Sequence, residues 1–434
     1  MSRLARLEGS ARFLALVKLA NVGLVLIWGF AVTFVFVRVL PIAEFQAFLL
    51  LVAFGNFTIS AEFGLTSIIY ARLRRHWLSS DDAAADDGGF RLEEMGVLFL
   101  FLALLVAGAT LILLAALALG WLATGLPLLF LLFFLSACLN LPALLAKRAL
   151  AAVDGNVLWE GLDCARRVVT IGLLLAMLSG LDPSLSVALQ LAVSIAVIGY
   201  AIGQVHRRLG MSRCQWLAFR VGGGHVRAHY LRDIGASAAF TVSDIVAYNA
   251  PYFTIALATN DARPMLVFDF FFKMSRSLSM LVRATVEAAL PRITRAYHAG
   301  DRVRLRQLLG RALAAAMLFA LGLSALLLFA GDRLFSLLFD GRAAIDRADI
   351  MLIVLALAAL TLLCVSVYVQ AALGRFGELL ARSLPFLAGS LASAPLALLF
   401  WPQRFDLAFL ALYALTLVGV AALHLVSLRG LMRA

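Results

Sequence analysis

Long runs of apolar residues recur along the whole 434-residue chain and are separated by short polar segments. About 20 apolar residues are needed for an α-helix to cross a lipid bilayer, and most of these runs reach that length. The pattern therefore predicts an all-α polytopic membrane protein with about twelve transmembrane helices. The expected spans are 14–37, 45–70, 96–119, 127–149, 162–180, 184–204, 236–257, 264–288, 311–330, 350–373, 384–400 and 406–427.

Composition and charge agree with this class. Hydrophobic residues make up 63% of the chain, charged residues only 14%, and the formal net charge is +12. Most Lys and Arg residues, Arg166 and Arg167 included, fall in segments that alternate onto one side of the membrane. The positive-inside rule then predicts that both termini are cytoplasmic. Because topology accounts for the positive charge, we expect no nucleic-acid partner.

Two similar segments indicate an internal repeat. RALAAVDGNVLWE (148–160) follows the fourth expected span, and VYVQAALGRFGEL (367–379) follows the tenth. Each places small residues, a Gly-containing turn and a Glu after an even-numbered helix. Two six-helix halves in the same orientation would be related by an axis along the membrane normal. We expect an N-terminal lobe at 1–206, a cytoplasmic linker at 207–235 and a C-terminal lobe at 236–434.

The span expected at 264–288 carries an unusual stripe of charge. A charged side chain at a bilayer centre costs about 2.5–3.5 kcal/mol on insertion scales, yet this span holds five: Asp269, Lys273, Arg276, Arg283 and Glu287. At about 100° per residue, all five fall within an arc of about 80°. One polar face along a water-filled substrate or ion pathway is therefore predicted. A structural ion-pair network between helices is the alternative.

Within the stripe, two pairs of opposite charge are spaced to interact along the helix. Asp269 and Lys273, like Arg283 and Glu287, lie four residues apart and can form ion pairs. Arg276 lies outside both pairs.

Three further polar residues lie in or near other spans. Lys18, at the inner end of the first span, could join the site or could extend to the lipid head groups. Glu62 is a carboxylate in the second span without a local partner. Asp244 belongs to a polar run before Pro251, where we expect a bend that is either a gate or a capped kink.

Several other chemistries are not indicated. We find no Ser/His/Asp arrangement and no His-rich cluster, so we predict neither an intramembrane enzyme nor a metal site. The GGG segment at 222–224 lacks the Lys and Ser/Thr of a phosphate-binding loop. No cofactor is expected, although coupling to H⁺ or Na⁺ is compatible with the acidic residues in the spans.

Three segments carry a family resemblance. The segment ALPRITRAYHAGDRVRLRQLLGRA (289–312) resembles the connection between helices 8 and 9 of the oligosaccharidyl-lipid flippases, through Pro291, Thr294, Tyr297, Gly300 and Asp301. RVLPIAEFQAFLLLVAFGNFTISAEFGLTSIIYARL (38–73) resembles their helix 1 to helix 2 segment. It departs from the pattern at Gln46, where Gly is usual, and it lacks a Gly before Pro41. GDRLFSLLFDGRAAIDRADIML (331–352) resembles their helix 9 to helix 10 loop.

The chain thus resembles the Wzx O-unit flippases of the multidrug/oligosaccharidyl-lipid/polysaccharide (MOP) exporter superfamily, which also contains MurJ and the MATE exporters. This resemblance implies two six-helix lobes around a central V-shaped cavity and transport by alternating access. The implied substrate is an undecaprenyl-pyrophosphate-linked oligosaccharide, flipped across the bacterial inner membrane for O-antigen, capsule or exopolysaccharide synthesis. Membrane lipids, a polysaccharide polymerase and chain-length proteins are implied partners.

With this substrate, residue roles can be assigned as expectations. Arg276, Lys273, Arg283 and Lys18 would contact the pyrophosphate in the cavity, because Arg and Lys supply fixed positive charge and several donors. Asp269, Glu287, Glu62 and Asp244 would bind a coupling ion or form ion pairs. A MATE-like, cation-coupled exporter of drugs or other small molecules is the alternative. A scaffold protein of a polysaccharide assembly complex is a third possibility.

Overall fold

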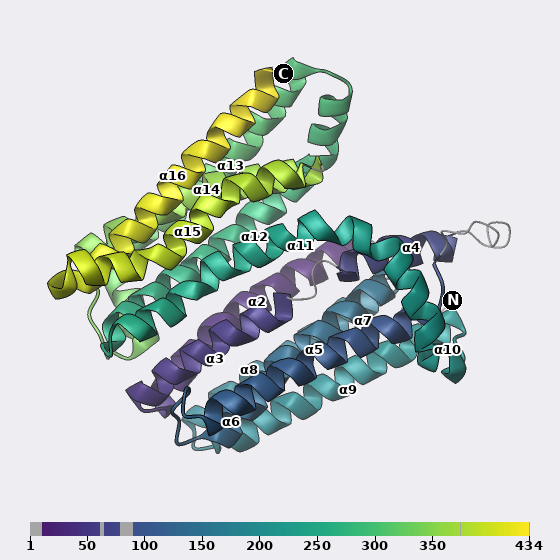
Figure 1. The fold of residues 1–434 in the computed structure, drawn as a ribbon, viewed down its shortest axis with the longest axis horizontal. Helices are drawn as coiled ribbons and strands as arrows, with labels where there is room; N and C mark the ends of the chain where they lie inside the picture. The colour runs from purple at the N-terminus through teal and green to yellow at the C-terminus, as the bar shows by residue number, and fades with distance from the viewer. Residues whose placement is uncertain (1–10, 61–64, 79–89, 374, 434) are drawn as a thin grey trace. The chain divides into compact units, whose positions relative to one another are not determined.

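The computed structural model describes residues 11–60, 65–78, 90–373 and 375–433. Throughout these ranges the regular structure is helical and no strand occurs, which confirms the all-α class. The helices separate into two compact units, Met1–Ala238 and Ala239–Ala434. Figure 1 shows the helices of both units.

Unit 1 is a bundle in which α2 packs along α8, while α9 contacts α6, α7 and α8. Its helices are α2 (Ala11–Val39), α3 (Ile42–Ser60), α4 (Leu65–Leu78), α5 (Glu93–Ala118), α6 (Pro127–Cys138), α7 (Asn140–Ala152), α8 (Asn156–Leu178), α9 (Pro183–Leu209), the short α10 (Arg213–Leu217) and the first part of α11 (Phe219–Ala258).

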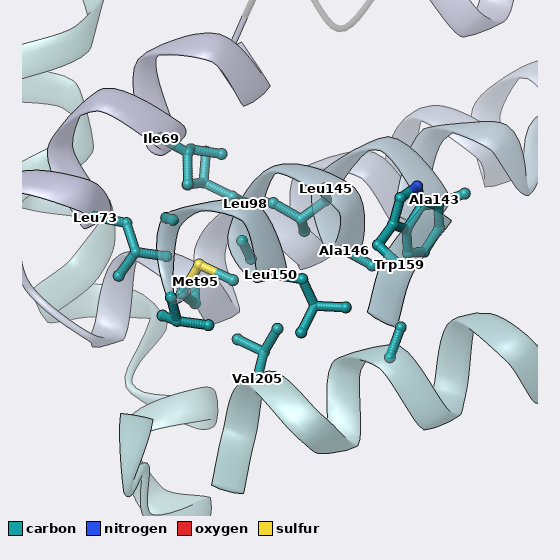
Figure 2. Packing of buried hydrophobic residues seen from close by; sticks show 14 of the residues in the cluster. Ile69, Leu73, Met95, Leu98, Ala143, Leu145, Ala146, Leu150, Trp159 and Val205 are labelled. Carbon is teal, nitrogen blue, oxygen red and sulfur yellow. The ribbon is translucent and has the colours of Figure 1, made fainter. Parts of the chain in front are cut away.

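A buried apolar cluster holds this bundle together (Figure 2). Leu73 of α4, Met95 of α5, Leu150 of α7, Trp159 of α8 and Val205 of α9 are each no more than 3% exposed. Lipid tails are as apolar as these side chains, so close packing between helices, rather than expulsion of water, stabilises such a core in a membrane.

Unit 2 is built around α14, which packs against α12, α13 and α16, while α15 packs against α16. Its helices are the remainder of α11, α12 (Ala262–His298), α13 (Arg302–Phe339), α14 (Arg347–Ala372), α15 (Phe376–Phe400), the 3₁₀ turn η1 (Pro402–Arg404) and α16 (Phe405–Arg433). Aromatic rings fill its core: the Phe268 ring centroid lies 5.0 Å from that of Tyr252 and 5.5 Å from that of Tyr413, both edge to face.

Nine helices in the described part of the chain are long and apolar enough to cross a membrane. Three more predicted spans are the helices α8, α11 and α12, of 23, 40 and 37 residues. Each is long enough to span a bilayer, but each is interrupted by polar or charged residues. The nine and these three lie where the spans were predicted from the sequence, and they make the chain a multi-pass membrane protein. Of the span predicted at 45–70, α3 covers the part up to Ser60 and α4 begins at Leu65, while residues 61–64 lie outside the described residues.

Helix boundaries differ from the predicted ones where backbone chemistry intervenes. The span predicted at 127–149 is broken at Leu139 into α6 and α7. Pro142 explains the break, because its ring nitrogen cannot donate to the carbonyl of Cys138 and its ring crowds that carbonyl. Elsewhere the helices run beyond the expected spans: α12 continues to His298, and α11 begins at Phe219, inside the segment expected to be a linker.

The connection between α12 and α13 is a tight turn built by two adjacent residues. Gly300 has a φ of +67°, a left-handed conformation that glycine adopts at little cost. Asp301 then caps α13, because its side chain accepts a hydrogen bond of 2.9 Å from the backbone N–H of Arg304. The Gly-Asp pair singled out in the sequence thus ends one helix and begins the next.

In each of the two similar segments one helix ends and the next begins, and in the second segment Gly374 lies outside the described residues. Helix α7 ends at Ala152 and α8 begins at Asn156, while α14 ends at Ala372 and α15 begins at Phe376. In both turns a backbone N–H closes onto a carbonyl five residues earlier: Gly155 onto Leu150 at 2.7 Å, and Arg375 onto Gln370 at 3.1 Å.

Candidate functional site

The predicted charged stripe lies on α12 in unit 2. Its first member, Asp269, is only 1% exposed. The Tyr252 hydroxyl donates a 2.7 Å hydrogen bond to Asp269 Oδ1, and Lys273 Nζ donates to Oδ2. The carboxylate therefore has a donor for each oxygen, and the ammonium group of Lys273 is held next to it.

The rest of the stripe is more accessible. Arg283 Nε donates a 2.7 Å hydrogen bond to Glu287, and these side chains are 56% and 51% exposed. Arg276 is exposed, and its guanidinium carbon lies 5.6 Å from the centre of the Phe272 ring. Both i,i+4 ion pairs expected from the sequence therefore form, and the stripe runs from a buried anchor to an exposed cationic face of unit 2.

The other predicted site residues are less closely connected. Lys18 is an exposed residue of α2 in unit 1, whereas the stripe belongs to unit 2. Asp244 is half-buried on α11 and forms no hydrogen bond or ion pair with any residue in the described ranges. Glu62 lies outside the described residues.

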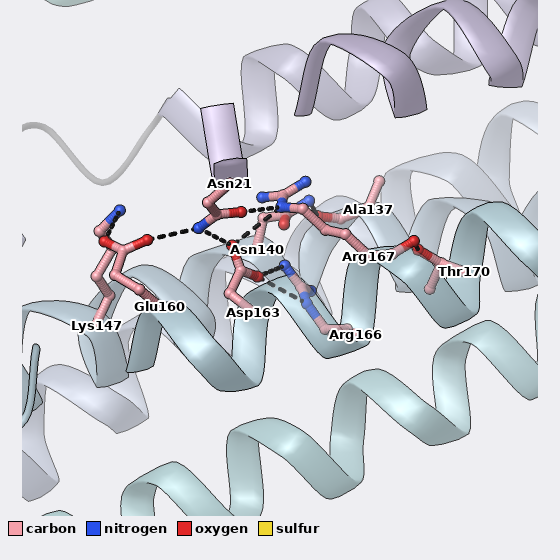
Figure 3. Close-up of polar contacts among 9 residues, drawn as sticks. All are labelled: Asn21, Ala137, Asn140, Lys147, Glu160, Asp163, Arg166, Arg167 and Thr170. Atoms are coloured by element: carbon pink, nitrogen blue, oxygen red, sulfur yellow. Dashed lines mark hydrogen bonds and ion pairs between the residues drawn. The ribbon is translucent and has the colours of Figure 1, made fainter. Parts of the chain in front are cut away.

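A second polar cluster, not predicted as a site from the sequence, lies inside unit 1 (Figure 3). Asn21 of α2 donates hydrogen bonds to two carboxylates of α8, Glu160 at 2.6 Å and Asp163 at 3.0 Å. Its amide oxygen accepts a 3.0 Å bond from Arg167 Nε. Asn21 thus joins α2 to the charged face of α8.

Asp163 is the centre of this network. Its Oδ1 accepts bonds from Arg166 Nε at 3.0 Å and Nη2 at 2.7 Å, and its Oδ2 accepts a 3.0 Å bond from Arg167 Nε. Side-chain exposure is 4% for Asp163, 8% for Arg166 and 19% for Arg167. A buried carboxylate gripped by two guanidinium groups is held in one geometry by charge-assisted hydrogen bonds.

The network continues to the edge of the unit. Lys147 Nζ of α7 lies 3.5 Å from Glu160 Oε1, and the Lys147 side chain is 42% exposed. In Figure 3, Lys147 and Glu160 lie at one end of the network, while Arg166 and Arg167 lie toward Thr170. The acidic and basic groups are therefore partly separated along α8.

A small cavity of about 40 Å³ opens beside the arginines. Arg166, Arg167 and Thr170 of α8 line it together with Gln190 and Ser194 of α9. By volume it holds about three waters. Its walls also include the apolar side chains Trp28, Phe133 and Ala137.

The spacing of the residues on α8 could have revealed this cluster. The positive-inside rule predicts that Arg166 and Arg167 are cytoplasmic charges, but both lie within α8 and are largely buried. Glu160, Asp163, Arg166 and Arg167 follow one another at three, three and one residues, which places them within an arc of about 120° on a helix. Their partner Asn21 is 142 residues from Asp163, so this contact carries no local signal.

Unit 2 contains another ion cluster, at the ends where three of its helices begin, and only one of its members is buried. Arg263 of α12 bonds to Asp346 at 2.9 Å and Asp349 at 2.8 Å, at the start of α14, and it also pairs with Asp406 of α16. Asp349 is only 2% exposed. One guanidinium therefore ties together the beginnings of α12, α14 and α16.

The three consecutive glycines belong to helix packing in unit 1. A Cβ atom on Gly222 of α11 would lie 2.6 Å from the carbonyl oxygen of Glu93, whereas one on Gly223 would meet nothing within 4 Å. One turn away, His225 Nδ1 pairs with Glu94, and both side chains are buried. The GGG segment thus lets the start of α11 approach α5 closely.

Comparison with known proteins gives no sequence match: no family model and no curated protein resembles this chain closely enough to be recognised. Solved structures do match over nearly the whole length. A mutant of VcmN, a MATE transporter of Vibrio cholerae, aligns with a TM-score of 0.63 and 15% identity, covering 97% of this chain and 96% of the other.

Two further structures agree. An inward-facing multidrug resistance MATE transporter of the MOP superfamily aligns with a TM-score of 0.68 and 13% identity, covering 96% of this chain and 98% of the other. The multidrug transporter DinF-BH, in complex with R6G, aligns with a TM-score of 0.62 and 16% identity, covering 98% and 96%. The chain has the MATE transporter fold. At such low identity the likeness establishes the fold and leaves the substrate open.

Proposed function

We propose that this protein is a flippase that moves undecaprenyl-pyrophosphate-linked oligosaccharide units across the bacterial inner membrane by alternating access, for surface polysaccharide synthesis. The MATE fold supports a transporter, and one observation supports an anionic substrate. The stripe on α12 holds three basic side chains, Lys273, Arg276 and Arg283, against the two acidic side chains Asp269 and Glu287.

The chemistry of the pyrophosphate fits such a stripe. A pyrophosphate that enters a membrane protein leaves water, so it needs fixed positive charge and hydrogen-bond donors along its path. Arginine remains protonated and can bind two oxygens at once. In this proposal the exposed Arg276 makes the first contact, Arg283 adds a second cation, and Lys273 is positioned by its bond to Asp269.

The remaining assignments complete this proposal. Both termini are cytoplasmic, and the protein works with a polysaccharide polymerase and chain-length proteins. Coupling to H⁺ or Na⁺ uses a carboxylate, for which Asp244 is the best candidate among the described residues. It is half-buried and forms no bond to another described residue, so it is available to bind an ion.

A MATE-like, cation-coupled exporter of small molecules is the second candidate, and the solved structures favour it. The matched proteins are MATE transporters, two of them described as multidrug transporters, and DinF-BH was solved in complex with R6G. Organic cations would be drawn to the acidic members of the α12 stripe and to Asp244 rather than to Arg276.

Complementation in a deletion strain tests the flippase proposal. Wild type, Arg276→Gln and Arg292→Gln would be expressed at matched membrane levels. Arg292 is an exposed arginine of the same helix, about 140° around the axis from Asp269, and serves as the control. Surface polysaccharide and the sidedness of lipid-linked repeat units would be measured.

We expect wild type and Arg292→Gln to restore polysaccharide, and Arg276→Gln to leave repeat units on the cytoplasmic leaflet. If deletion leaves surface polysaccharide intact, the flippase proposal fails. Export of R6G from the same cells would then decide for the second candidate.

A further inference from the structure

The cavity in unit 1 has a one-sided chemical character. Among the described side chains that line it are two arginines and the neutral polar residues Ser136, Asn140, Thr170, Gln190 and Ser194, but no acidic residue. Glu160 and Asp163 belong to the same network yet lie outside the lining. A cation would meet two positive charges here, whereas an anion would meet donors.

Both arginines have guanidinium N–H groups that form no hydrogen bond to a described residue. Arg167 uses its Nε for both of its bonds, to Asn21 and Asp163, so neither terminal amino group is bonded to a described residue. Arg166 uses Nε and Nη2 on Asp163, which leaves Nη1. No nitrogen of Arg166 or Arg167 is an enclosed polar atom without a hydrogen-bond partner. The remaining guanidinium N–H groups are therefore available to the cavity that these residues line.

A neutral group in the lining points the same way. Ser194 is only 3% exposed and its hydroxyl forms no hydrogen bond to another described residue. Ser194 Oγ is not one of the enclosed polar atoms that lack a partner, so the hydroxyl is open to the cavity and can donate to a group bound there. Gln190, 4% exposed, uses one amide N–H in a long 3.4 Å bond to Ser186 and has a second to offer.

We propose that this cavity binds a phosphate-class oxyanion, held by the guanidinium groups of Arg166 and Arg167 and by the neutral donors of α9. Arginine is the side chain best suited to phosphate oxygens because its planar fork presents several N–H groups together. The size of the cavity, about 40 Å³, suits one phosphate-sized group rather than a glycan. Asp163 orients the two arginines and occupies their Nε groups. Binding here is independent of what the protein transports.

The test is calorimetric titration of the full-length protein in an uncharged detergent with inorganic phosphate, which matches the size of the cavity, at ionic strength held constant with sodium chloride. We expect saturable binding to wild type. Arg167→Gln should weaken it about tenfold or more, the loss typical of one charge-assisted hydrogen bond. Arg74→Gln is the control, because Arg74 is an arginine of unit 1 that pairs with Asp154 and does not line the cavity.

A second variant keeps the test decisive if Arg167→Gln does not fold. Gln190→Met with Ser194→Ala removes neutral donors from the lining and leaves every ion pair of the network in place. It should weaken phosphate binding about threefold to tenfold. Absence of saturable binding to wild type, or unchanged binding in this folded double variant, would show that the cluster is only a structural network.

The source of the oxyanion is resolved with lipid. Wild type would be titrated with inorganic phosphate in two nanodiscs of equal negative surface charge, one of phosphatidylcholine with oleate and one of phosphatidylcholine with phosphatidylglycerol. If a lipid phosphate fills the site, phosphatidylglycerol should weaken phosphate binding to wild type relative to oleate. If the ligand is a free oxyanion, both nanodiscs should give the same affinity. Either result supports the site, provided that Arg74→Gln behaves as wild type.

Discussion

The Tyr252 hydroxyl lies 2.7 Å from Asp269 Oδ1, across the contact between α11 and α12, while Lys273 holds the other oxygen of the same carboxylate. Tyr252 is 1% exposed, as is Asp269. Tyr252 of α11 therefore supplies a hydrogen bond to an ion pair, Asp269 and Lys273, whose two members both lie on α12. This bond links the position of α11 to that of α12.

Replacing this tyrosine should destabilise unit 2. Tyr252→Phe removes the donor to Oδ1 and should lower stability by about 1–3 kcal/mol, because a buried carboxylate oxygen is left unsatisfied. Asp269→Asn should cost more, about 3–5 kcal/mol, because the Lys273 ammonium loses its counter-charge. Thermal unfolding in detergent measures both. Tyr200→Phe, at a tyrosine that is 52% exposed, is the control, and equal melting temperatures for Tyr252→Phe and the control would contradict the expectation.

Replacing Arg263 should lower the stability of unit 2 more than replacing any other arginine at the end where α12, α14 and α16 begin. Arg263→Gln leaves Asp346, Asp349 and Asp406 close together without their shared cation. Because Asp349 is buried, we expect the free energy of unfolding to fall by about 3–5 kcal/mol, measured by thermal unfolding in detergent. The nearby Arg404→Gln, at an exposed position of η1, should leave the melting temperature unchanged.

A double variant separates charge from packing at this cluster. Asp349→Asn removes the buried carboxylate, so the combination with Arg263→Gln should lose clearly less stability than the sum of the two single changes. Additive losses would indicate that Arg263 acts through its packing and not through its ion pairs.

Two neighbouring glycines of α11 should respond in opposite directions. Gly222→Ala places a Cβ atom 2.6 Å from a backbone carbonyl of α5, so we expect a loss of about 1–3 kcal/mol. Gly223→Ala meets open space, and alanine favours a helix over glycine by up to about 1 kcal/mol. The melting temperatures of the two variants test this prediction. If both variants melt higher than wild type, or both melt lower, this explanation of the GGG segment is wrong.

The contact between α15 and α16 depends on Gly389 in the same way. A Cβ atom there would lie 2.3 Å from Thr416 Cγ2 and 2.9 Å from its Cβ. Gly389→Ala should therefore lower the melting temperature, while Gly419→Ala, with nothing within 4 Å, should not. Adding Thr416→Gly to Gly389→Ala should recover part of the loss. A double variant that melts below Gly389→Ala alone would argue against the clash.

The sequence predicted the fold class and the local pairs because both depend on short-range periodicity. Runs of apolar residues mark the spans, and i,i+4 spacing places Asp269 beside Lys273 and Arg283 beside Glu287. Pro142 likewise carries a local signal for the break at Leu139. These features follow from residues a few positions apart.

Long-range partners could not be predicted in this way. Nothing near Asn21 indicates that it joins Glu160 and Asp163, which are 139 and 142 residues away. The positive-inside rule also assigned Arg166 and Arg167 to a cytoplasmic segment, because it counts charge and cannot detect a buried counter-charge. The network forms because α2 packs along α8, a contact between segments far apart in the sequence.

The cluster around Arg263 also bears on how the protein is made. Arg263 leaves the ribosome well before its partners: Asp346 and Asp349 follow 83 and 86 residues later, and Asp406 later still. During synthesis the Arg263 guanidinium therefore lacks these counter-charges, and it is hydrated or bound to lipid head groups until first α14 and then α16 have been synthesised. A nascent chain stalled before α16 has an incomplete charge cluster at that end of unit 2, a feature by which membrane quality control could distinguish unfinished copies from finished ones.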